Sequence, residues 1–359
     1  KHGIKLVLGY TVEGFKEKDN GVEVLLKDNP SLQADMVVLA IGVTPDTALA
    51  KEAGLELGIK GSIVVNDRME TSVPDIYAAG DAVQVKHYVT GNDALISLAG
   101  PANKQGRIIA DNICGGDSRY LGSQGSSVIK VFDMTAATTG INETNAKKSG
   151  LDVDTVILSP MSHAGYYPGG KVMTMKVVFE KETYRLLGAQ IIGYEGVDKR
   201  IDVLATAIHA GLKATQLKDL DLAYAPPYSS AKDPVNMAGF MIDNIAKGTL
   251  KQWHLEDMDK ISKDKSVVLL DVRTVGEFNR GHMDGFRNIP VDELRERINE
   301  IEKGKPVYLI CQSGLRSYIA SRILEGNGYE TYNFSGGFRF YDAVVNDRAL
   351  IEKSYACGM

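Results

Sequence analysis

Short apolar runs separated by polar turns recur along the chain and predict its secondary structure. Residues 4–8 (IKLVL) and 22–26 (VEVLL) are typical of strands. Residues 36–43 (MVVLAIGV) are continuously apolar up to a glycine, which predicts a buried strand, and residues 76–79 (IYAA) predict a further strand that ends at Gly80. Alone, this pattern indicates only an α/β fold or a small sheet.

Residues 126–245 combine strand and helix signals. The expected strands are VIKVF, TVILSP, MTMKVVFE and LLGAQIIG, and the turn EKETY joins the last two as a hairpin. Helix signals follow near residues 142–150 and 197–211. This part of the chain is therefore predicted to be an α+β unit.

The last part contains an apolar run, PVYLI, then CQSGLR at residues 311–316, then SYIASRIL, whose apolar residues recur at helical spacing. A strand that feeds a helix through a short loop points N–H groups into one concavity, and the helix N-terminus adds partial positive charge. Thiolate, the reactive form of cysteine, is favoured there, and Arg316 adds a cation. We therefore expect Cys311 to be a nucleophile; the alternative is a small buried hydrophobe.

The length of this loop indicates which chemistry it serves. Four residues lie between Cys311 and Arg316, one fewer than cysteine phosphatases use to surround a phosphate with N–H groups. The tighter loop suits a terminal sulfur atom, which predicts a cysteine persulfide. At this point the segment resembles a rhodanese domain, and the resemblance extends through residues 271–290 (DVRTVGEFNRGHMDGFRNIP) and covers about residues 254–350. Phe286 stands where that family usually has a small residue.

The resemblance implies a role for each residue of the loop. Cys311 would carry the sulfur, and Arg316 would help to stabilise its anionic forms. Asp271 and Arg273 would organise the loop from a neighbouring strand. Without the resemblance, these last two would be a strand-end ion pair that contributes little if it is exposed. We expect His282 to be a structural turn residue rather than a base.

Composition limits the possible partners. The 359 residues are too many for one rhodanese-sized core, so two to four packed units are expected, and 44% hydrophobic with 24% charged residues is ordinary for a globular protein. A net charge of −5 with scattered basic residues argues against nucleic acid. No apolar stretch reaches about 18 residues, so no membrane span is expected. Three widely separated cysteines and no visible signal peptide favour a reducing cytoplasm.

The stretch TSVPDIYAAGDAV, residues 71–83, places a glycine and a carboxylate directly after a predicted strand. Gly80 allows close backbone approach, and Asp81 can accept hydrogen bonds from sugar or ribityl hydroxyls. Residues 98–113 then predict a helix with Pro101 in its first turn, and its N-terminus could stabilise negative charge on a flavin's pyrimidine edge. A lone glycine–aspartate pair would indicate only a β-turn.

Together these features resemble the second FAD-binding motif of the pyridine nucleotide–disulfide reductases. AIGVTPDT at residues 40–47 resembles the segment that precedes that motif, where the nicotinamide and flavin regions of the family meet. The resemblance implies FAD and NAD(P)H as cofactors. The residues that it places at them are Asp81 as ribityl ligand, Leu98 and Ala99 as backbone contacts near the flavin ring, and Gly80, Gly42 and Pro45.

The sequence also departs from that family. No G-x-G-x-x-G follows any predicted strand, so both the first FAD fingerprint and the nicotinamide-nucleotide fingerprint are missing. The family's N-terminal redox cysteine is missing as well, and the chain begins at Lys1, in the middle of a domain. We therefore expect the C-terminal part of a longer enzyme, and whether this chain holds FAD by itself stays open.

Residues 126–245 resemble the dimerisation domain of the same family, in which two subunits complete each other's active sites across a two-fold axis. The resemblance implies a homodimer. The family's motif for a partner-chain acid/base histidine is absent, so we expect His209 to be structural. Of the other cysteines, we expect Cys114 to be buried structure and Cys357 to lie in a terminal tail.

Two loops, at residues 163–170 (HAGYYPGG) and 222–236 (LAYAPPYSSAKDPVN), contain paired aromatic residues among glycines and prolines. A tyrosine hydroxyl can donate a hydrogen bond to a thiolate leaving group. The loops resemble those of coenzyme A-disulfide reductases, in which two tyrosines reach toward the partner subunit's redox cysteine, and this implies coenzyme A as a ligand. We assign these roles to Tyr166 and Tyr224; the alternative is that the tyrosines only pack the loops. The next candidates are Tyr167 and Tyr228.

These resemblances divide a mixed α/β and α+β chain into successive parts. They are a C-terminal remnant of the NAD(P)-binding region (1–43), the second half of the FAD-binding region (44–122), the dimerisation domain (123–246), a linker (247–253) and the rhodanese domain (254–359).

The resulting hypothesis is an FAD-dependent NAD(P)H oxidoreductase acting on coenzyme A disulfide, coenzyme A persulfide or polysulfide, with a rhodanese domain that handles sulfane sulfur. We expect a cytoplasmic homodimer with a small-molecule substrate. The alternative is a rhodanese sulfur carrier attached to a non-catalytic dimerising fragment. The sequence ranks neither the three substrates nor NADH against NADPH.

Overall fold

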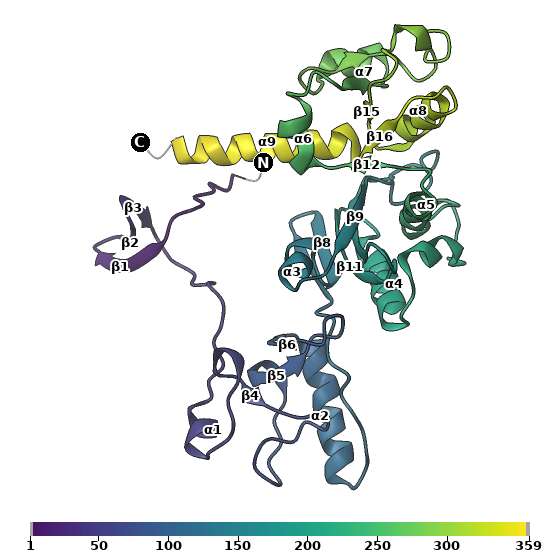
Figure 1. Ribbon diagram of the computed structural model, residues 1–359. Helices are drawn as coiled ribbons and strands as arrows, with labels where there is room; N and C mark the ends of the chain where they lie inside the picture. Colours follow the sequence, from purple (N-terminus) through teal and green to yellow (C-terminus); the bar gives the residue numbers. More distant parts are fainter. Residues whose placement is uncertain (1–2, 357–359) are drawn as a thin grey trace. The chain divides into compact units, whose positions relative to one another are not determined.

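The computed structural model describes residues 3–356, with side chains for residues 3–347. The chain divides into two compact units, and Figure 1 labels their helices and strands. One unit comprises residues 1–43 and 341–359, and the other comprises residues 44–340.

The first unit contains an antiparallel meander, in which β2 pairs with both β1 and β3. The strands are β1 (Val12–Lys18), β2 (Gly21–Leu26) and β3 (Asn29–Ala34). The strand predicted at residues 22–26 is confirmed as β2. Residues 4–8 form no strand, so that prediction is wrong. The segment has no ladder partner among the described residues, and a strand persists only where its backbone groups pair.

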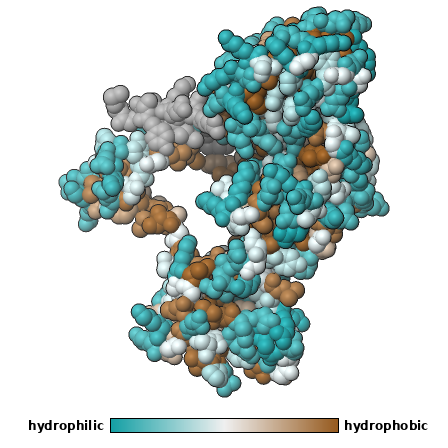
Figure 2. All heavy atoms as spheres, viewed as in Figure 1, coloured by the Kyte–Doolittle hydropathy of each residue, from teal (hydrophilic) through white to brown (hydrophobic). Residues whose placement is uncertain are grey.

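The buried strand predicted at residues 36–43 is also wrong. This segment has no regular secondary structure, and most of its apolar side chains are exposed, Ile41 by 89%. Figure 2 shows hydrophobic atoms at the surface of the chain that follows β3. An apolar run becomes a buried strand when other strands and helices cover it. Within the described part of the chain, this segment has no such cover.

The second unit begins with a small region of short elements. They are α1 (Ala48–Glu52), β4 (Ile63–Val64), β5 (Val83–Lys86), β6 (Asp93–Ala94) and α2 (Ala99–Ile113). Buried Met69, Val83 and Val85 form its core. The predicted helix is confirmed as α2: Leu98 is its N-cap, and Pro101 lies in the first turn, where the N–H that proline lacks would have no helical partner.

The strand predicted at residues 76–79 is only an isolated bridge between Tyr77 and Glu70, so the predicted strand is wrong in extent. The backbone is nevertheless extended at Ala79, with φ −147° and ψ 168°, and it leads into a 3-10 turn over Gly80–Ala82. The local conformation therefore follows the prediction, while the ladder that neighbouring strands would supply does not form.

The α+β region that follows contains an antiparallel sheet in the order β7-β8-β11-β10-β9. Its strands are β7 (Ser127–Val131), β8 (Met134–Gly140), β9 (Val153–Leu158), β10 (Thr174–Glu180) and β11 (Leu186–Gly193). Its helices are α3 (Glu143–Lys148), α4 (Val197–His209) and α5 (Pro234–Ala246). The predicted strands, hairpin and two helices are confirmed, whereas β8 and α5 escaped the sequence pattern.

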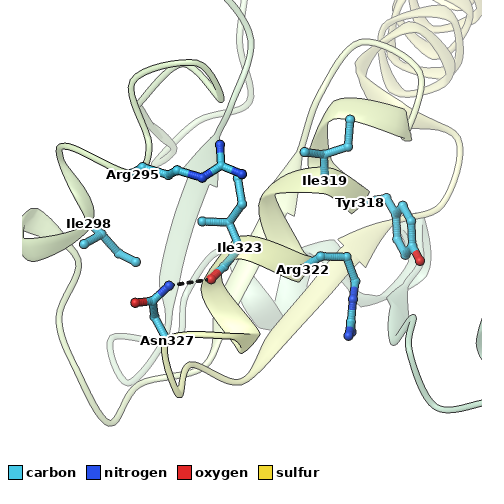
Figure 3. Close-up of a pocket in the computed structure, with 7 residues that line it drawn as sticks. All are labelled: Arg295, Ile298, Tyr318, Ile319, Arg322, Ile323 and Asn327. Carbon is cyan, nitrogen blue, oxygen red and sulfur yellow. Dashed lines mark hydrogen bonds between the residues drawn. The ribbon is translucent and has the colours of Figure 1, made fainter.

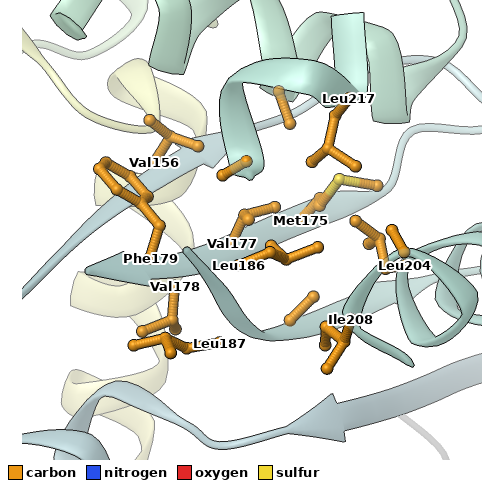
Figure 4. Close-up of a cluster of buried hydrophobic side chains, with 14 of the residues drawn as sticks. Val156, Met175, Val177, Val178, Phe179, Leu186, Leu187, Leu204, Ile208 and Leu217 are labelled. Atoms are coloured by element: carbon orange, nitrogen blue, oxygen red, sulfur yellow. The ribbon is translucent and has the colours of Figure 1, made fainter. Parts of the chain in front are cut away.

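The core of this region packs against both faces of the sheet. Val177 and Val178 are consecutive in β10, and both are fully buried, although consecutive residues of a strand point to opposite faces. Figure 4 shows them on opposite sides of the strand, Val178 near Leu187. Burying one such aliphatic side chain contributes roughly 1.5–3 kcal/mol, so this sheet provides a rigid support for the loops at its edge.

The C-terminal α/β region contains a parallel sheet in the order β12-β16-β15-β13-β14. The strands are β12 (Gln252–Trp253), β13 (Val268–Asp271), β14 (Arg287–Asn288), β15 (Val307–Ile310) and β16 (Thr331–Phe334). The helices are α6 (Met258–Ile261), α7 (Val275–Arg280), α8 (Leu315–Glu325) and α9 (Gly337–Ala356). The last two residues of the predicted linker thus form β12, and the combination of α/β and α+β parts is confirmed.

Hydrogen bonds join the α+β region to the C-terminal sheet within the second unit. The Ile157 N–H of edge strand β9 donates to Ser335 Oγ at 3.0 Å, and Gln252 Nε2 donates to the Thr155 carbonyl at 3.2 Å. Because β9 is an edge strand, this N–H has no partner within its own sheet, and the Ser335 hydroxyl accepts its hydrogen bond instead. Among the described helices, none is long and apolar enough to cross a membrane.

Candidate active site

Cys311 directly follows β15 and lies at the N-terminus of α8. Its sulfur is buried and accepts hydrogen bonds from the Gly314 N–H at 3.1 Å and from Ser317 Oγ at 3.2 Å. Gly314 is the N-cap of α8 with φ +101°, a conformation that glycine adopts without strain. The strand, loop and helix therefore aim two neutral donors at the thiol; the sequence predicted backbone donors but not the Ser317 hydroxyl.

The loop is held from behind by the start of α9, which the sequence analysis did not identify. The Phe338 N–H donates to the Cys311 carbonyl at 2.8 Å, and the Arg339 N–H donates to the Gln312 carbonyl at 3.2 Å. A Cβ on Gly337 would lie 2.7 Å from that second carbonyl oxygen, so only glycine fits there. The double glycine at residues 336–337 was the available signal.

Arg316 is paired with a residue that sequence reasoning also missed. Its Nη1 and Nη2 donate to Glu277 Oε2 and Oε1, each at 2.7 Å. This hydrogen-bonded pairing lowers the pKa of Glu277 to about 2 and raises the pKa of Arg316. Glu277 also accepts from the N–H of Thr274, which forms the capping box of α7. That T-x-x-E spacing would have indicated the helix start, but not the contact with Arg316.

Asp271 and Arg273 form a buried ion pair rather than an exposed one. Arg273 Nε and Nη2 donate to Asp271 Oδ2 at 2.9 and 2.7 Å. Arg273 also donates to the Gly281 carbonyl at 2.7 Å and to Gln312 Oε1 at 3.4 Å. Its guanidinium carbon lies 3.8 Å from the centre of the Phe338 ring. Because β13 and β15 are neighbours, this pair lies where it can hold the loop after Cys311.

Other residues singled out in the sequence have structural surroundings. His282 Nδ1 lies 3.1 Å from the Phe278 carbonyl, and the two rings stack at 3.9 Å. His209 stacks on Tyr88 at 5.2 Å.

The prediction that Cys114 is buried is wrong. Cys114 is exposed and is the C-cap residue of α2. Cys357 lies outside the described residues.

The structure brings together Gly80, Asp81, Leu98 and Ala99 at the N-terminus of α2. Gly80 has φ +85°, and its N–H donates at 2.7 Å to Gln105 Oε1. Gln105 is buried, and the sequence analysis did not identify it. The side chain of Asp81 is exposed. The N-cap Leu98 offers no side-chain acceptor to the first N–H groups of the helix. These features fit a polar, partly anionic ligand such as the ribityl–pyrimidine part of a flavin.

The remaining two predicted cofactor residues lie elsewhere in the chain. Gly42 has φ +99°, and nothing lies within 4 Å of the place where its Cβ would be. Gly42 belongs to the first compact unit and Pro45 to the second. The structure therefore groups four of the six predicted cofactor contacts, and the assignment of Gly42 and Pro45 stays a prediction.

The two predicted tyrosines touch each other. Tyr166 Oη lies 2.6 Å from Tyr224 Oη, although the two residues come from different loops and are 76% and 45% exposed. The hydrogen bond raises the pKa of Tyr224. Tyr224 and Tyr228 line a pocket of about 480 Å³ together with His163 and Lys199. Of the next candidates, Tyr167 packs edge-on against His163 at 5.6 Å.

An ion pair under this pocket joins the two tyrosine loops and was not predicted. Arg200 Nη2 donates to the Ser162 carbonyl at 2.9 Å, beside the first loop, and to Asp233 Oδ2 at 2.8 Å, in the second. Asp233 in turn caps α5 by accepting from the Val235 N–H at 3.0 Å. Burial opposes ionisation of Asp233, but the hydrogen bonds from Arg200, Val235 and Ser229 outweigh it and lower its pKa.

A separate groove of about 540 Å³ lies along the outer face of α8 (Figure 3). Its wall includes Arg295, Ile319 and Ile323, and Asn327 closes one end by donating to the Ile323 carbonyl at 2.8 Å. None of the predicted site residues lines this groove.

Three family patterns match successive parts of the chain. Residues 1–106 match the pyridine nucleotide-disulphide oxidoreductases, residues 126–234 match the dimerisation domain of that family, and residues 254–343 match the rhodanese-like domain. The first two matches together cover more than half of the chain. The chain therefore belongs to the pyridine nucleotide-disulphide oxidoreductases and carries a rhodanese-like domain, which confirms both resemblances.

Within that class, the chain is similar to enzymes of sulfur metabolism. The crystal structure of reduced Bacillus anthracis CoADR-RHD has a TM-score of 0.91 and 46% identity, covering 94% of this chain and 60% of that one. An NAD-dependent persulfide reductase from A. fulgidus has a TM-score of 0.84 and 41% identity, with 92% and 60% covered. The NAD(P)H sulfur oxidoreductase (CoA-dependent) of Pyrococcus abyssi is 38% identical over 66% of this chain and 52% of that protein. The chain spans about half the length of the curated relatives that it matches.

Proposed function

We propose that this chain is part of a NAD(P)H-dependent flavin oxidoreductase that reduces coenzyme A disulfide, coenzyme A persulfide or polysulfide, and that Cys311 carries sulfane sulfur as a persulfide. The observation that carries this proposal is the Cys311 sulfur, buried at the start of α8 with the Gly314 N–H and the Ser317 hydroxyl donating to it. Such donors suit a sulfur anion. The sulfur and persulfide activities for which the relatives are named support the same substrate class.

In this proposal the other loop residues position Cys311. Arg316 supplies a cation beside the helix N-terminus. Asp271 and Arg273 hold the loop through the contact with Gln312 and stay buried, so losing either partner would leave an uncompensated charge.

For the flavin, Gly80, Asp81, Leu98 and Ala99 would hold the ribityl and pyrimidine part through backbone groups and one carboxylate. Gly42 and Pro45 would lie nearer the nicotinamide. When bound, FAD would supply two-electron chemistry between NAD(P)H and a disulfide. The chain's own contribution is the exposed Asp81 carboxylate and the uncapped N–H groups of α2.

For coenzyme A, the Tyr166–Tyr224 pair would donate a hydrogen bond to the departing thiolate. Their exposure on one chain fits a role toward a partner subunit, so we propose a homodimer formed through the dimerisation domain. Because each hydroxyl can donate only one proton, the 2.6 Å contact leaves one of the two free to donate to a ligand.

We propose the domain boundaries at residues 43, 122, 246 and 253. Gln252 and Trp253, at the end of the linker, already form a strand of the rhodanese-like sheet. Cys114 and Cys311 are both free thiols, which supports a reducing, cytoplasmic location.

A flavin spectrum tests the reductase part. The complete protein should be yellow, NADH should bleach it without oxygen, and coenzyme A persulfide should restore the colour. A colourless protein that still loads sulfur on Cys311 would favour the alternative, a sulfur carrier attached to a dimerising fragment.

A further inference from the structure

Two guanidinium groups lie close to the Cys311 loop, and each is matched by a carboxylate. Arg273 is paired with buried Asp271. Arg316, in the first turn of α8, has both terminal nitrogens on Glu277, each at 2.7 Å. The cations are therefore largely neutralised, and the donors that reach the sulfur itself, from Gly314 and Ser317, are uncharged.

The side chains next to this ion pair are apolar and exposed. Val275 opens α7, and Leu315 opens α8; they are 52% and 66% exposed, and Ile319 on the next turn of α8 is 43% exposed. Both helices begin at the same edge of the sheet, because β13 and β15 are parallel neighbours. The surface where α7 and α8 begin thus combines exposed apolar side chains with the carboxylate of Glu277.

We propose that Glu277 is a specificity-determining residue that disfavours the dianionic donor thiosulfate and favours alkyl persulfides whose substituent carries no charge next to the transferred sulfur. The inference rests on the proposed function, in which Cys311 accepts sulfane sulfur. A carboxylate paired to the first turn of α8, directly after the Cys311 loop, raises the energy of a dianion more than that of a singly charged or neutral donor. It also withholds Arg316, the cation that thiosulfate would otherwise use.

The two transfers differ in the leaving group and in whether the new persulfide keeps a proton. In the first, the Cys311 thiolate attacks the outer sulfur of R–S–SH, the donor's S–S bond breaks, RS⁻ leaves with the electron pair, and the proton stays on the new Cys311–S–SH. In the second, the thiolate attacks the outer sulfur of thiosulfate, SO₃²⁻ leaves, and Cys311–S–S⁻ remains. Only the second brings a dianion to Glu277 and releases another.

The test compares both donors on the full chain carrying Glu277→Gln. Glutamine keeps an oxygen for the Thr274 N–H, so the helix cap survives, while the bidentate ion pair is lost. With thiosulfate and N-acetylcysteamine persulfide as donors, the ratio of kcat/KM values should shift toward thiosulfate by about tenfold or more. Because the effect is electrostatic, the shift should shrink at about 1 M salt.

The matched control is Glu325→Gln, which breaks a second glutamate–arginine pair, to Arg322, at the other end of α8. Ten residues along the helix place it about 15 Å from the first turn. The donor ratio should not move in this variant. Thr274→Ala removes the α7 cap and one neutral hydrogen bond to Glu277 Oε2 but leaves the Glu277–Arg316 ion pair, so it should likewise keep the ratio within about twofold of the wild type.

Glu277→Ala, checked for folding by circular dichroism, provides a second variant if the glutamine protein is unstable. An unchanged donor ratio in either folded variant would overturn the inference, and so would an equal shift in Thr274→Ala. Failure of the wild-type chain to take up sulfur at Cys311 from both donors would instead overturn the proposed function, and the inference with it.

Discussion

Arg200 and Asp233 form a buried ion pair that fastens the two tyrosine loops to one another. Their side chains are almost completely buried, and Arg200 Nη2 lies 2.8 Å from Asp233 Oδ2. The same guanidinium donates to the Ser162 carbonyl, beside the first tyrosine loop, and to Ser229 Oγ in the second. Arg200 therefore holds both loops that border the pocket of Tyr224. The tyrosine pair therefore depends on a contact that neither tyrosine makes.

Asp233→Ala should lower the free energy of unfolding by about 3–5 kcal/mol, because it leaves Arg200 buried without its partner. Urea denaturation measures this. Asp243→Ala on the same helix is the control: Asp243 pairs with the more exposed Lys218 and Lys247, so its loss should cost no more than about 1 kcal/mol. Equal effects of the two substitutions would contradict the account.

The same pair gives a pH dependence with a defined sign. The pKa of Asp233 is lower in the folded chain than its ordinary value. Its contribution is therefore fully present above the unfolded pKa of about 3.9 and is lost as the pH falls through the folded pKa. The stability difference between the wild type and Asp233→Ala should shrink below about pH 4.

Tyr166→Phe and Tyr224→Phe should each slow the turnover of coenzyme A-linked substrates in the flavin-loaded protein. Losing one donor to a leaving thiolate typically costs about 2–4 kcal/mol, or roughly thirty- to a thousand-fold in rate. Folding and sulfur loading at Cys311 should stay nearly unchanged, because the rings remain. Steady-state kinetics decide this. Wild-type kinetics in both variants would return the tyrosines to a packing role, and a defect in Tyr167→Phe alone would move the assignment to Tyr167.

Ser335→Ala should destabilise the joint between β9 and the rhodanese-like domain. It leaves the buried Ile157 N–H without a partner, which costs about 1–3 kcal/mol. Ser321→Ala is the matched control, since that hydroxyl donates to the Tyr318 carbonyl of its own helix and its removal leaves no N–H unpaired. Thermal unfolding of both variants gives the comparison; similar midpoints would argue against a role for Ser335.

Light scattering tests the proposed dimer. The chain should have twice its monomer mass at micromolar concentration, because its dimerisation domain presents exposed apolar strand residues such as Ile129 and Ile192. A clean monomer at that concentration would reject the homodimer for this chain.

Local sequence signals predicted the parts of the fold that depend on local structure. The cradle at Cys311 combines one strand, one glycine with positive φ and one helix, which adjacent residues supply, whereas its support from α9 comes from a distant part of the chain. The prediction of a buried strand at residues 36–43 was wrong because the neighbours of an apolar run, and not its own composition, decide whether it is buried.

Long-range polar contacts could not be predicted in the same way. Glu277 and Arg316 are 39 residues apart, and Arg200 and Asp233 are 33 apart, so no spacing rule connects them. Tyr166 and Tyr224, 58 residues apart, were chosen through a family resemblance, and the structure then placed their hydroxyls together.

The most direct test of the account is the intact mass of the chain after incubation with N-acetylcysteamine persulfide and removal of excess donor. The wild type should gain the mass of one sulfur atom, and dithiothreitol should remove it. Cys114→Ser, which removes an exposed thiol, should gain the same mass, and Cys311→Ser should gain none. An equal gain in Cys311→Ser would contradict the claim that Cys311 carries the sulfur.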